Sequence, residues 1–403
     1  MRYNKPNKLY YRIAQIASWF FATFIFRRKV LRNEIRHAKG PFVVIANHQA
    51  AYDFVNLIGM TWRPMSFVIS NSFYQSLPIT GFLKKMGVIP KQQFQTTVSD
   101  MKNMKAVVDA GEALAIYPAG LMCEDGLPTP VPAATYKFLK WLGVDVYVAR
   151  TTGTYFVMPK WGRGMRSGKT FLDVYKLISA EELAHMDVDT VREKVDQALS
   201  FDAYRDQEEM LVRYHRGDDI RGLENVLYTC PACGQEFTVS VKDRSTIFCV
   251  DCGFAHKADD RGFLHNVGNT PEEIRYASDW SRMIQDRLED AVRQEQNITI
   301  SAETKVCMID YRRHAFREVG EAVVTLDREA FHLDGTLFGV PFKKDISIVG
   351  LPTLPFSPGK YFEIQDGKDI YRCVLSDGRQ VTKFINLVKI FYRLNHRAPV
   401  KMK

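Results

Sequence analysis

The stretch PFVVIANHQAAYD, residues 41–53, decides the fold of the N-terminal half of the chain. It opens with a short, continuous apolar run rich in β-branched side chains, residues 41–46, which predicts a buried strand. Residues 49–60 then read as a helix. At the junction lie a histidine, His48, and a carboxylate five residues later, Asp53. A strand that runs directly into a helix is typical of a layered α/β domain.

The same alternation continues along the chain. Further strands are predicted at residues 66–70, 114–117 and 144–149, and further helices at residues 98–109 and 135–142. This order indicates α/β layers up to about residue 178. A capping box, Ser179-Ala-Glu-Glu182, then opens a charged helical tail. The sequence therefore predicts one α/β domain with a helical tail over residues 41–225.

The spacing of His48 and Asp53 has a chemical meaning. Residues five apart lie about 140° from each other around a regular helix, so the two side chains meet only if His48 precedes the helix. From there Asp53 can hold one ring nitrogen and leave the other basic toward a substrate hydroxyl. The alternative is a structural histidine that is hydrogen-bonded at a strand end.

In this context the sequence resembles the glycerophospholipid acyltransferase family, which includes the lysophosphatidate acyltransferases. Residues 47–53 match its first motif, 87–91 its second, 117–120 its third and 144–148 its fourth. The resemblance implies that His48 and Asp53 are catalytic, with the histidine as general base. It also implies that substrate is bound by Asn47, Lys91, Tyr117, Pro118 and Gly120.

The implied function is transfer of a fatty acyl group from acyl-CoA or acyl carrier protein to the hydroxyl of a lysophospholipid such as 1-acylglycerol-3-phosphate. Two positions depart from the family pattern. Lys91 stands where arginine is usual and Ala119 stands where glutamate is usual, which leaves the acceptor open. Glu124 or Asp125 could supply the carboxylate, and the alternative is a solvated loop pair. A further alternative is a catalytically altered protein that keeps the fold to bind lipid.

The first 40 residues form a basic head. They hold ten Lys or Arg and one acidic residue, so the whole formal net charge of +9 lies there. Its uncharged apolar run, residues 13–26, is shorter than the ~20 residues that span a bilayer. Trp19 and several phenylalanines, followed by Arg27-Arg28-Lys29, predict a helix on an anionic membrane surface, with the protein peripheral on the cytoplasmic face. The alternative is a helix buried against the protein's own core. A cleaved signal peptide is not expected, because no small-residue site follows.

Two Cys-x-x-Cys pairs, with fifteen residues between them, predict a zinc ribbon over residues 226–258. Four thiolates leave no open coordination position, so the predicted zinc is structural and not catalytic. Disulfides are the alternative, although scattered cysteines elsewhere indicate a reducing compartment. His256 reads as a surface residue. The predicted ligands are Cys230, Cys233, Cys249 and Cys252.

A zinc ribbon also raises nucleic-acid binding as a rival function. Basic residues are sparse in this ribbon and no cationic stripe with stacking aromatics accompanies them, so no nucleic-acid partner is expected.

The C-terminal part reads as β-rich. A second capping box, Thr270-Pro-Glu-Glu273, predicts a linking helix over residues 270–297. From residue 298 short alternating strands are separated by turns at 333–337, 357–361, 366–367 and 377–378. One amphipathic helix, residues 381–394, ends this region. Residues 298–403 therefore resemble a pleckstrin-homology or GRAM-like barrel.

Overall fold

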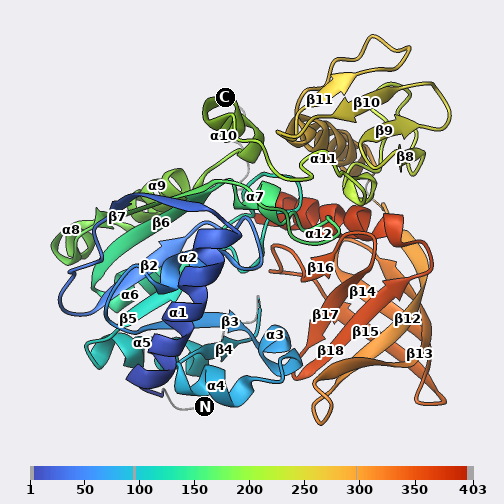
Figure 1. The fold of residues 1–403 in the computed structure, drawn as a ribbon. Coiled ribbons are helices and arrows are strands. Elements are labelled where there is room, and N and C mark those ends of the chain that lie inside the picture. The colour runs from blue at the N-terminus through green and yellow to red at the C-terminus, as the bar shows by residue number, and fades with distance from the viewer. Residues whose placement is uncertain (1–3, 94–96, 296, 397–403) are drawn as a thin grey trace, which may run out of the picture. The chain divides into compact units, whose positions relative to one another are not determined.

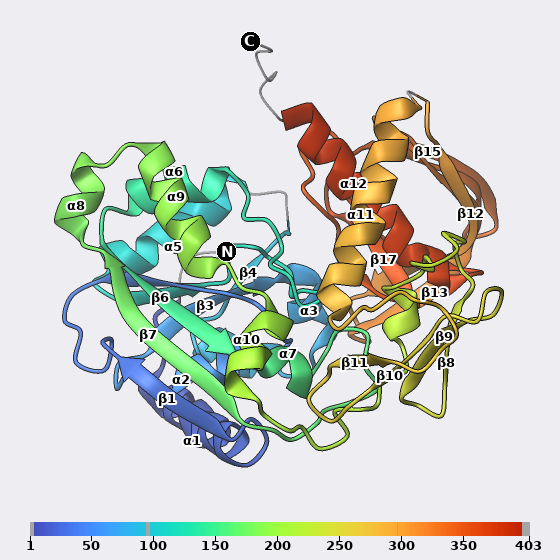
Figure 2. The ribbon, with the colours of Figure 1, turned by 90° about the horizontal axis from the view of Figure 1, so that it is seen from above.

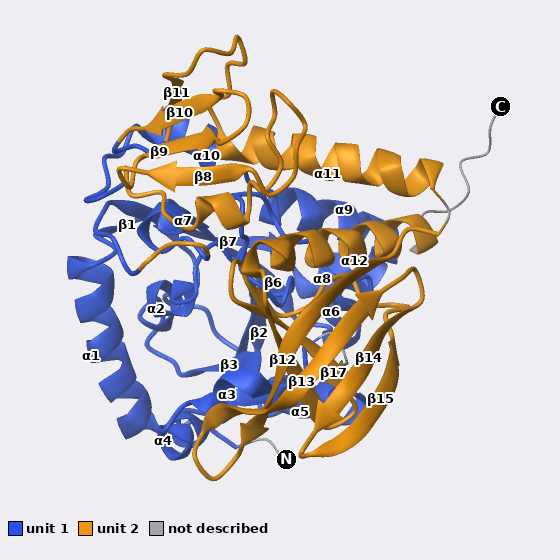
Figure 3. Cartoon of the chain, turned by 90° about the vertical axis from the view of Figure 1, so that its right-hand side faces the viewer, with its two compact units in different colours: residues 1–160, 164–217, 260–262 blue, residues 161–163, 218–259, 263–403 orange. Residues whose placement is uncertain are grey.

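A computed structural model describes residues 4–93, 97–295 and 297–396. The chain divides into two compact units. Unit 1 comprises residues 1–160, 164–217 and 260–262, and unit 2 comprises residues 161–163, 218–259 and 263–403 (Figure 3). Each unit has its own sheets and core, and each is described separately below.

Unit 1 is built on one seven-stranded sheet with the strand order β1-β7-β6-β2-β5-β3-β4 (Figure 1). Neighbouring strands are parallel except for β6 and β7, which are antiparallel. The strands are β1 (Arg28–Asn33), β2 (Phe42–Ala46), β3 (Met65–Ser70), β4 (Ile89–Lys91), β5 (Ala113–Ile116), β6 (Asp145–Thr152) and β7 (Thr170–Ile178).

Helices cover both faces of this sheet, which gives the predicted layers. Figure 2 shows α1 and α2 on one face and α5, α6, α8 and α9 on the other. All five residues of β2 are buried between the two layers. The helices are α1 (Lys8–Phe24), α2 (Asp53–Ile58), α3 (Asn71–Ser76), α4 (Thr80–Lys85), α5 (Val98–Asp109), α6 (Ala134–Leu142), α7 (Thr154–Val157), α8 (Ala180–His185), α9 (Val188–Leu199) and α10 (Ala203–Met210).

The strands and helices predicted in this half are present, but the helix expected at residues 49–60 is shorter. It begins at Asp53, because the Asp53 carboxylate accepts the backbone N–H groups of Gln49 and Ala50 and holds that segment as a turn. The capping box at Ser179 and Glu182 is confirmed at the start of α8. Three strands, β1, β4 and β7, were not predicted from the sequence.

Helix α1 has two faces of different character. Its inner face is buried and consists mainly of small side chains, with Ala14, Ser18 and Ala22 beside the larger Tyr11. The Tyr11 hydroxyl donates to the Ile58 carbonyl of α2 at 3.5 Å. The outer face is apolar and 40–69% exposed, and it consists of Leu9, Ile13, Ile16, Trp19, Phe20, Phe21 and Phe24. In the described part of the chain, no helix combines the length and apolarity needed to cross a membrane.

Unit 2 contains a small four-stranded sheet, a long helix and a seven-stranded barrel-like sheet. The barrel-like sheet has the order β15-β14-β13-β12-β18-β17-β16, so that its first strand pairs with its last long strand. The elements are η1 (Leu223–Asn225), β8 (Val239–Lys242), β9 (Thr246–Cys249), β10 (Ala255–Ala258), β11 (Leu264–Asn266), α11 (Ala277–Gln294), β12 (Ile300–Asp310), β13 (Ala315–Leu326), β14 (Ala330–Leu337), β15 (Val340–Ser347), β16 (Phe356–Ser357), β17 (Tyr361–Asp366), β18 (Asp369–Leu375), η2 (Gly378–Gln380) and α12 (Val381–His396).

Helices α11 and α12 both pack on the barrel core (Figures 2 and 3). Arg393 of α12 pairs with Glu289 of α11 at 2.6 Å. The predicted turn at residues 333–337 is wrong, because this segment is the end of β14. Gly335 allows β14 to approach β13 closely, since a Cβ atom at this position would lie 2.2 Å from the Glu321 carbonyl oxygen. The turns predicted at residues 357–361 and 366–367 are confirmed.

Two predictions about the segment before the barrel are also wrong. The helix begins at Ala277 and not at residue 270, because the preceding backbone bonds to other parts of the ribbon. The Asn266 side chain donates to the Thr270 carbonyl, and the Ile274 N–H donates to Nε2 of His256 at 3.2 Å. His256, expected at the surface, is therefore fully buried, and its ring stacks on Phe254.

A histidine clamp on the barrel gives a pH-dependent prediction. His332 on β14 lies between two carboxylates, with Nε2 2.9 Å from Asp327 and Nδ1 2.7 Å from Asp345. The hydrogen bonds to Asp327 and Asp345 raise the pKa of His332. Because the folded pKa is above the unfolded value of about 6.5, the stabilisation is complete below that pH and is lost as pH rises through the folded pKa.

We therefore expect His332→Gln to destabilise the barrel at pH 6 and to have little effect at pH 9. The buried thiol of Cys373 on β18 reports barrel opening, so its alkylation rate in urea is compared between wild type and variant at each pH. An equal effect of the substitution at both pH values would contradict the charged clamp.

Candidate active site

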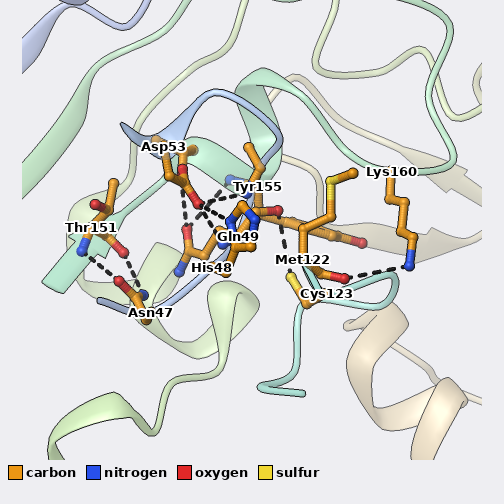
Figure 4. A network of polar contacts seen from close by, with 11 residues as sticks. Asn47, His48, Gln49, Asp53, Met122, Cys123, Thr151, Tyr155 and Lys160 are labelled. Atoms are coloured by element: carbon orange, nitrogen blue, oxygen red, sulfur yellow. Dashed lines mark hydrogen bonds and ion pairs between the residues drawn. The ribbon is translucent and has the colours of Figure 1, made fainter. Parts of the chain in front are cut away.

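The two residues of the predicted catalytic pair meet at the carboxyl end of β2. His48 lies in the turn after the strand, and Asp53 is the first residue of α2. Nδ1 of His48 is 3.1 Å from Oδ2 of Asp53 (Figure 4). The Asp53 side chain is fully buried, whereas 19% of the His48 side chain is exposed. The histidine thus presents its ring outward from a buried carboxylate.

Asp53 is held rigidly by the backbone around it. Its Oδ2 atom also accepts the N–H groups of Gln49 at 2.7 Å and Ala50 at 2.8 Å. A carboxylate that faces Nδ1 favours the tautomer with the proton on Nδ1, which leaves Nε2 as the basic nitrogen. The start of α2 adds a favourable helix dipole at the carboxylate. This arrangement can accept a proton from a hydroxyl placed at Nε2.

The strand exit is fixed to the neighbouring strand by Asn47. Its amide donates to the Thr151 carbonyl of β6 and accepts the Thr151 N–H, both at 2.8 Å (Figure 4). The side chain of Gln49 accepts the Tyr155 N–H at 3.3 Å and so holds the same turn from its other side. Asn47 is buried and sets the position of His48, and its contact with substrate stays a prediction.

The loop after β5 brings the predicted third motif to the histidine. The ring of Tyr117 lies with its centroid 4.6 Å from that of His48, and burial together with the Asp53 charge raises the pKa of Tyr117 well above its usual range. Gly120 closes a turn, with φ +71° and its N–H bonded to the Tyr117 carbonyl. The intervening Pro118 is half-buried. Tyr117, Pro118 and Gly120 thus lie beside the catalytic pair.

Comparison with known proteins agrees with this geometry. A family model described as Acyltransferase matches residues 27–165, which contain the whole His48 site. Residues 27–165 are an acyltransferase-family domain. The resemblance inferred from the motifs is thereby confirmed at the level of the family.

Among solved structures, the 1-acyl-sn-glycerophosphate acyltransferase PlsC of Thermotoga maritima is 18% identical and covers 51% of this chain and 79% of its own, with a TM-score of 0.40. The Ran-binding domain of Nup2 from Ashbya gossypii is 12% identical and covers 25% of this chain and 97% of its own, with a TM-score of 0.21. No curated protein matches the chain.

Within the acyltransferase domain, Lys91 lies at the end of β4, at the same sheet edge as His48 but three strands away from β2. Burial lowers the pKa of Lys91, and the charge of Asp100 opposes that shift. Its Nζ atom donates to the Gln92 carbonyl at 3.2 Å. Lys91 is thus a partly desolvated cation on one flank of the site.

The alternative interpretation of the acidic pair after the third motif, a solvated loop, is wrong. Glu124 and Asp125 are 4% and 3% exposed. Their loop is tied to the catalytic turn by Cys123, whose N–H donates to the His48 carbonyl at 3.0 Å and whose thiol faces the Gln49 carbonyl at 3.7 Å (Figure 4). Burial raises the pKa of the Cys123 thiol well above its usual range, and the charges of Asp125, Glu124 and Asp53 add to this rise.

Cys123 was missed as a site residue from the sequence, where it is one of three scattered cysteines. Its position three residues after the third motif was the available signal. The acyltransferase domain therefore carries buried carboxylates close to the catalytic turn, although Ala119 removes the one that the family provides.

The predicted metal ligands come together in unit 2. The four sulfurs of Cys230, Cys233, Cys249 and Cys252 all lie within 4.8 Å of one another. Cys230 and Cys252 are 3.6 Å apart, and Cys233 and Cys249 are 3.8 Å apart. All seven cysteines, which fall in the described ranges, are free thiols, so the disulfide alternative is not what the structure has. The cluster can hold a metal ion.

Proposed function

We propose that the chain is an O-acyltransferase that moves a fatty acyl group from acyl-CoA or acyl carrier protein to the hydroxyl of a lysophospholipid. The observation that carries the proposal is the 3.1 Å contact of His48 Nδ1 with Asp53 inside a domain that matches the acyltransferase family. A buried carboxylate and an imidazole with one free nitrogen are the groups that activate a hydroxyl nucleophile.

The proposed reaction is a single displacement. Nε2 of His48 removes the hydroxyl proton as the oxygen attacks the thioester carbonyl carbon, which forms a tetrahedral intermediate. The carbon–sulfur bond then breaks, and the departing thiolate takes the proton from His48. Asp53 stabilises the charged imidazolium between these steps. The N–H groups of Gln49 and Ala50 already bind Asp53, so they hold the base and not the oxyanion.

The acceptor side is proposed from the positions around the histidine. Lys91 supplies a cation for an acceptor phosphate, while Asn47, Tyr117, Pro118 and Gly120 shape the site. Wild-type turnover with a panel of lysolipid acceptors and one long-chain acyl-CoA tests this directly. A chain that binds lysolipid but transfers no acyl group to any acceptor would favour the catalytically altered lipid-binding alternative.

The membrane part of the proposal rests on the outer face of α1. Seven large apolar side chains on one exposed face, followed by Arg27, Arg28 and Lys29, fit a helix that lies at the boundary of an anionic bilayer. We propose peripheral attachment at the cytoplasmic face through this surface.

Trp19→Glu is expected to weaken vesicle binding at least ~10-fold, because a charge replaces an inserted aromatic ring. The matched control is Trp141→Glu on α6, on the opposite sheet face, where Trp141 is 48% exposed against 58% for Trp19. Sedimentation with phosphatidylglycerol vesicles measures both variants. Equal binding by the Trp19 variant and wild type, or equal loss in both variants, would refute attachment through α1.

We also propose that the four-cysteine cluster holds a structural zinc ion. Zinc–sulfur bonds of about 2.3 Å place neighbouring sulfurs of a tetrahedron about 3.8 Å apart, close to the two separations given above. Since all four positions are filled by protein ligands, the ion supplies folding energy and takes no part in acyl transfer.

For the C-terminal barrel we propose the pleckstrin-homology or GRAM-like class. Three features support this assignment. Four antiparallel strands follow one another in sequence, three further strands pair back to the first, and a final helix packs on the core.

A further inference from the structure

Arg28, the first residue of β1, has an unusual environment. Its side chain is half-buried, and one guanidinium nitrogen donates to the Asn56 carbonyl of α2 at 2.5 Å. It forms no ion pair with any residue that the structure describes. Arg32 on the same strand is the ordinary case, because it makes a two-pronged contact with Asp173 at 2.8 Å.

The electrostatics of Arg28 follow from this. Burial lowers its pKa to about 10, and no carboxylate opposes the shift. For Arg32, the hydrogen bond to Asp173 raises the pKa. A cation in a low-dielectric place without a counter-charge is costly, so an anion that joins it is bound more strongly than at an exposed lysine or arginine.

The strand register places Arg28 at the same sheet edge as His48. Arg28 pairs with Thr170 at the start of β7, and the start of β7 faces the end of β6, where Phe171 pairs with Thr152. The end of β6 lies beside the end of β2. Strand β1 is three strands from β2, which is about 14 Å. The guanidinium reaches back to α2, where Asn56 is about 4.5 Å along the helix axis from Asp53.

A second observation marks this spot. The Asn56 side chain is fully buried, yet among the residues that the structure describes neither its amide nitrogen nor its amide oxygen has a hydrogen-bond partner. Asp53, one turn earlier on α2, likewise has a buried Oδ1 atom without a partner. Buried polar atoms are nearly always satisfied, so unsatisfied ones next to a catalytic pair point to a missing polar ligand.

We infer that Arg28 binds the phosphate group of a glycerophospholipid on the flank of the site opposite to Lys91. The inference rests on the proposed acyl transfer to such a lipid. A guanidinium matches phosphate oxygens in a two-pronged geometry that lysine lacks. Because β1 follows α1 directly, the phosphate would lie near the C-terminal end of α1. It belongs either to the acceptor itself, in which case Arg28 and not Lys91 at the other edge of the sheet binds the acceptor phosphate, or to a neighbouring lipid of the bilayer.

The test uses the full chain in dodecyl maltoside micelles that contain either lysophosphatidate or monoacylglycerol, with binding measured by calorimetry in the absence of an acyl donor. Arg28→Gln keeps a donor for the Asn56 carbonyl but removes the charge, Arg28→Lys keeps the charge, and Lys102→Gln is the control at an exposed lysine of α5. Arg28→Gln is expected to weaken lysophosphatidate binding at least ~10-fold and to leave monoacylglycerol binding unchanged. Arg28→Lys should give an intermediate loss, and Lys102→Gln less than ~2-fold.

The two phosphate sources give different results. A loss in lysophosphatidate micelles assigns the phosphate to the acceptor, whereas a loss confined to phosphatidylglycerol vesicles assigns it to the bilayer. If Arg28→Gln changes neither, or weakens both micellar ligands equally, Arg28 only caps α2 and the inference is wrong. If binding depends on Arg28 but wild type transfers no acyl group, the proposed function fails while the phosphate site stands.

Discussion

Replacement of His48 by alanine should lower the rate of acyl transfer by ~10²–10⁴-fold, because general-base catalysis contributes about this much. The measurement is transfer of a radiolabelled acyl group from acyl-CoA, since the seven free cysteines would react with a thiol-detecting dye. Asp53→Asn should give a loss of similar size, because it removes the charge that fixes the tautomer and stabilises the imidazolium.

The control for this experiment is His37→Ala, which changes an exposed histidine of the same domain. It should retain full turnover. Both His48→Ala and Asp53→Asn should keep the melting temperature within a few degrees and the metal content of wild type. Undiminished turnover by the His48 variant would remove the base assignment, and with it the central step of the proposed reaction.

Loss of metal should have the second large effect, on the folding of the ribbon in unit 2. A structural zinc ion contributes roughly 10–16 kcal/mol of apparent binding free energy in small zinc modules, which is more than a short four-stranded sheet gains by burial. Cys233→Ser is expected to lower the zinc content from one ion per chain to a small fraction. Cys307→Ser, at a half-buried cysteine of the barrel, should leave the zinc content unchanged.

Trp280 provides a local probe of this unfolding. Its indole N–H donates to the Thr229 carbonyl next to the first cysteine pair, and its ring meets that of Phe254 at 5.1 Å. Addition of a chelator should shift its emission to the red, and Trp280→Phe should abolish the shift. If a sample that has lost its metal still gives an unshifted emission spectrum, the ribbon keeps its fold without the ion.

Elements with a strong local signal could be predicted from the sequence. β2 is a continuous apolar run, and α5 begins directly after a capping threonine, Thr97. The spacing of the two cysteine pairs predicts the ribbon. The contact between His48 and Asp53 could also be predicted, because both side chains lie within one stretch of six residues. The first residue of α2 could not be predicted, because it depends on which backbone N–H groups the Asp53 carboxylate accepts.

Features decided by distant partners could not be predicted. β1 has a polar sequence because it is an exposed edge strand. It pairs with β7, some 140 residues later. His256 looks like a surface residue until Ile274 bonds to its ring. Glu124 and Asp125 look solvated until Cys123 ties their loop to the His48 turn. In each case the structure depends on a contact between residues distant in sequence, and such a contact leaves no periodic trace in the sequence.

The edge position of β1 decides how the chain can be shortened. A deletion that ends before Arg28 removes the exposed apolar face of α1, but it also uncovers Leu57 and Ile58 of α2, which share a core with the inner face of α1. A deletion that extends to residue 40 also strips the outermost strand and leaves the long β7 with unpaired backbone groups, a template for self-association. A shortened chain should therefore keep Arg28 and the rest of β1.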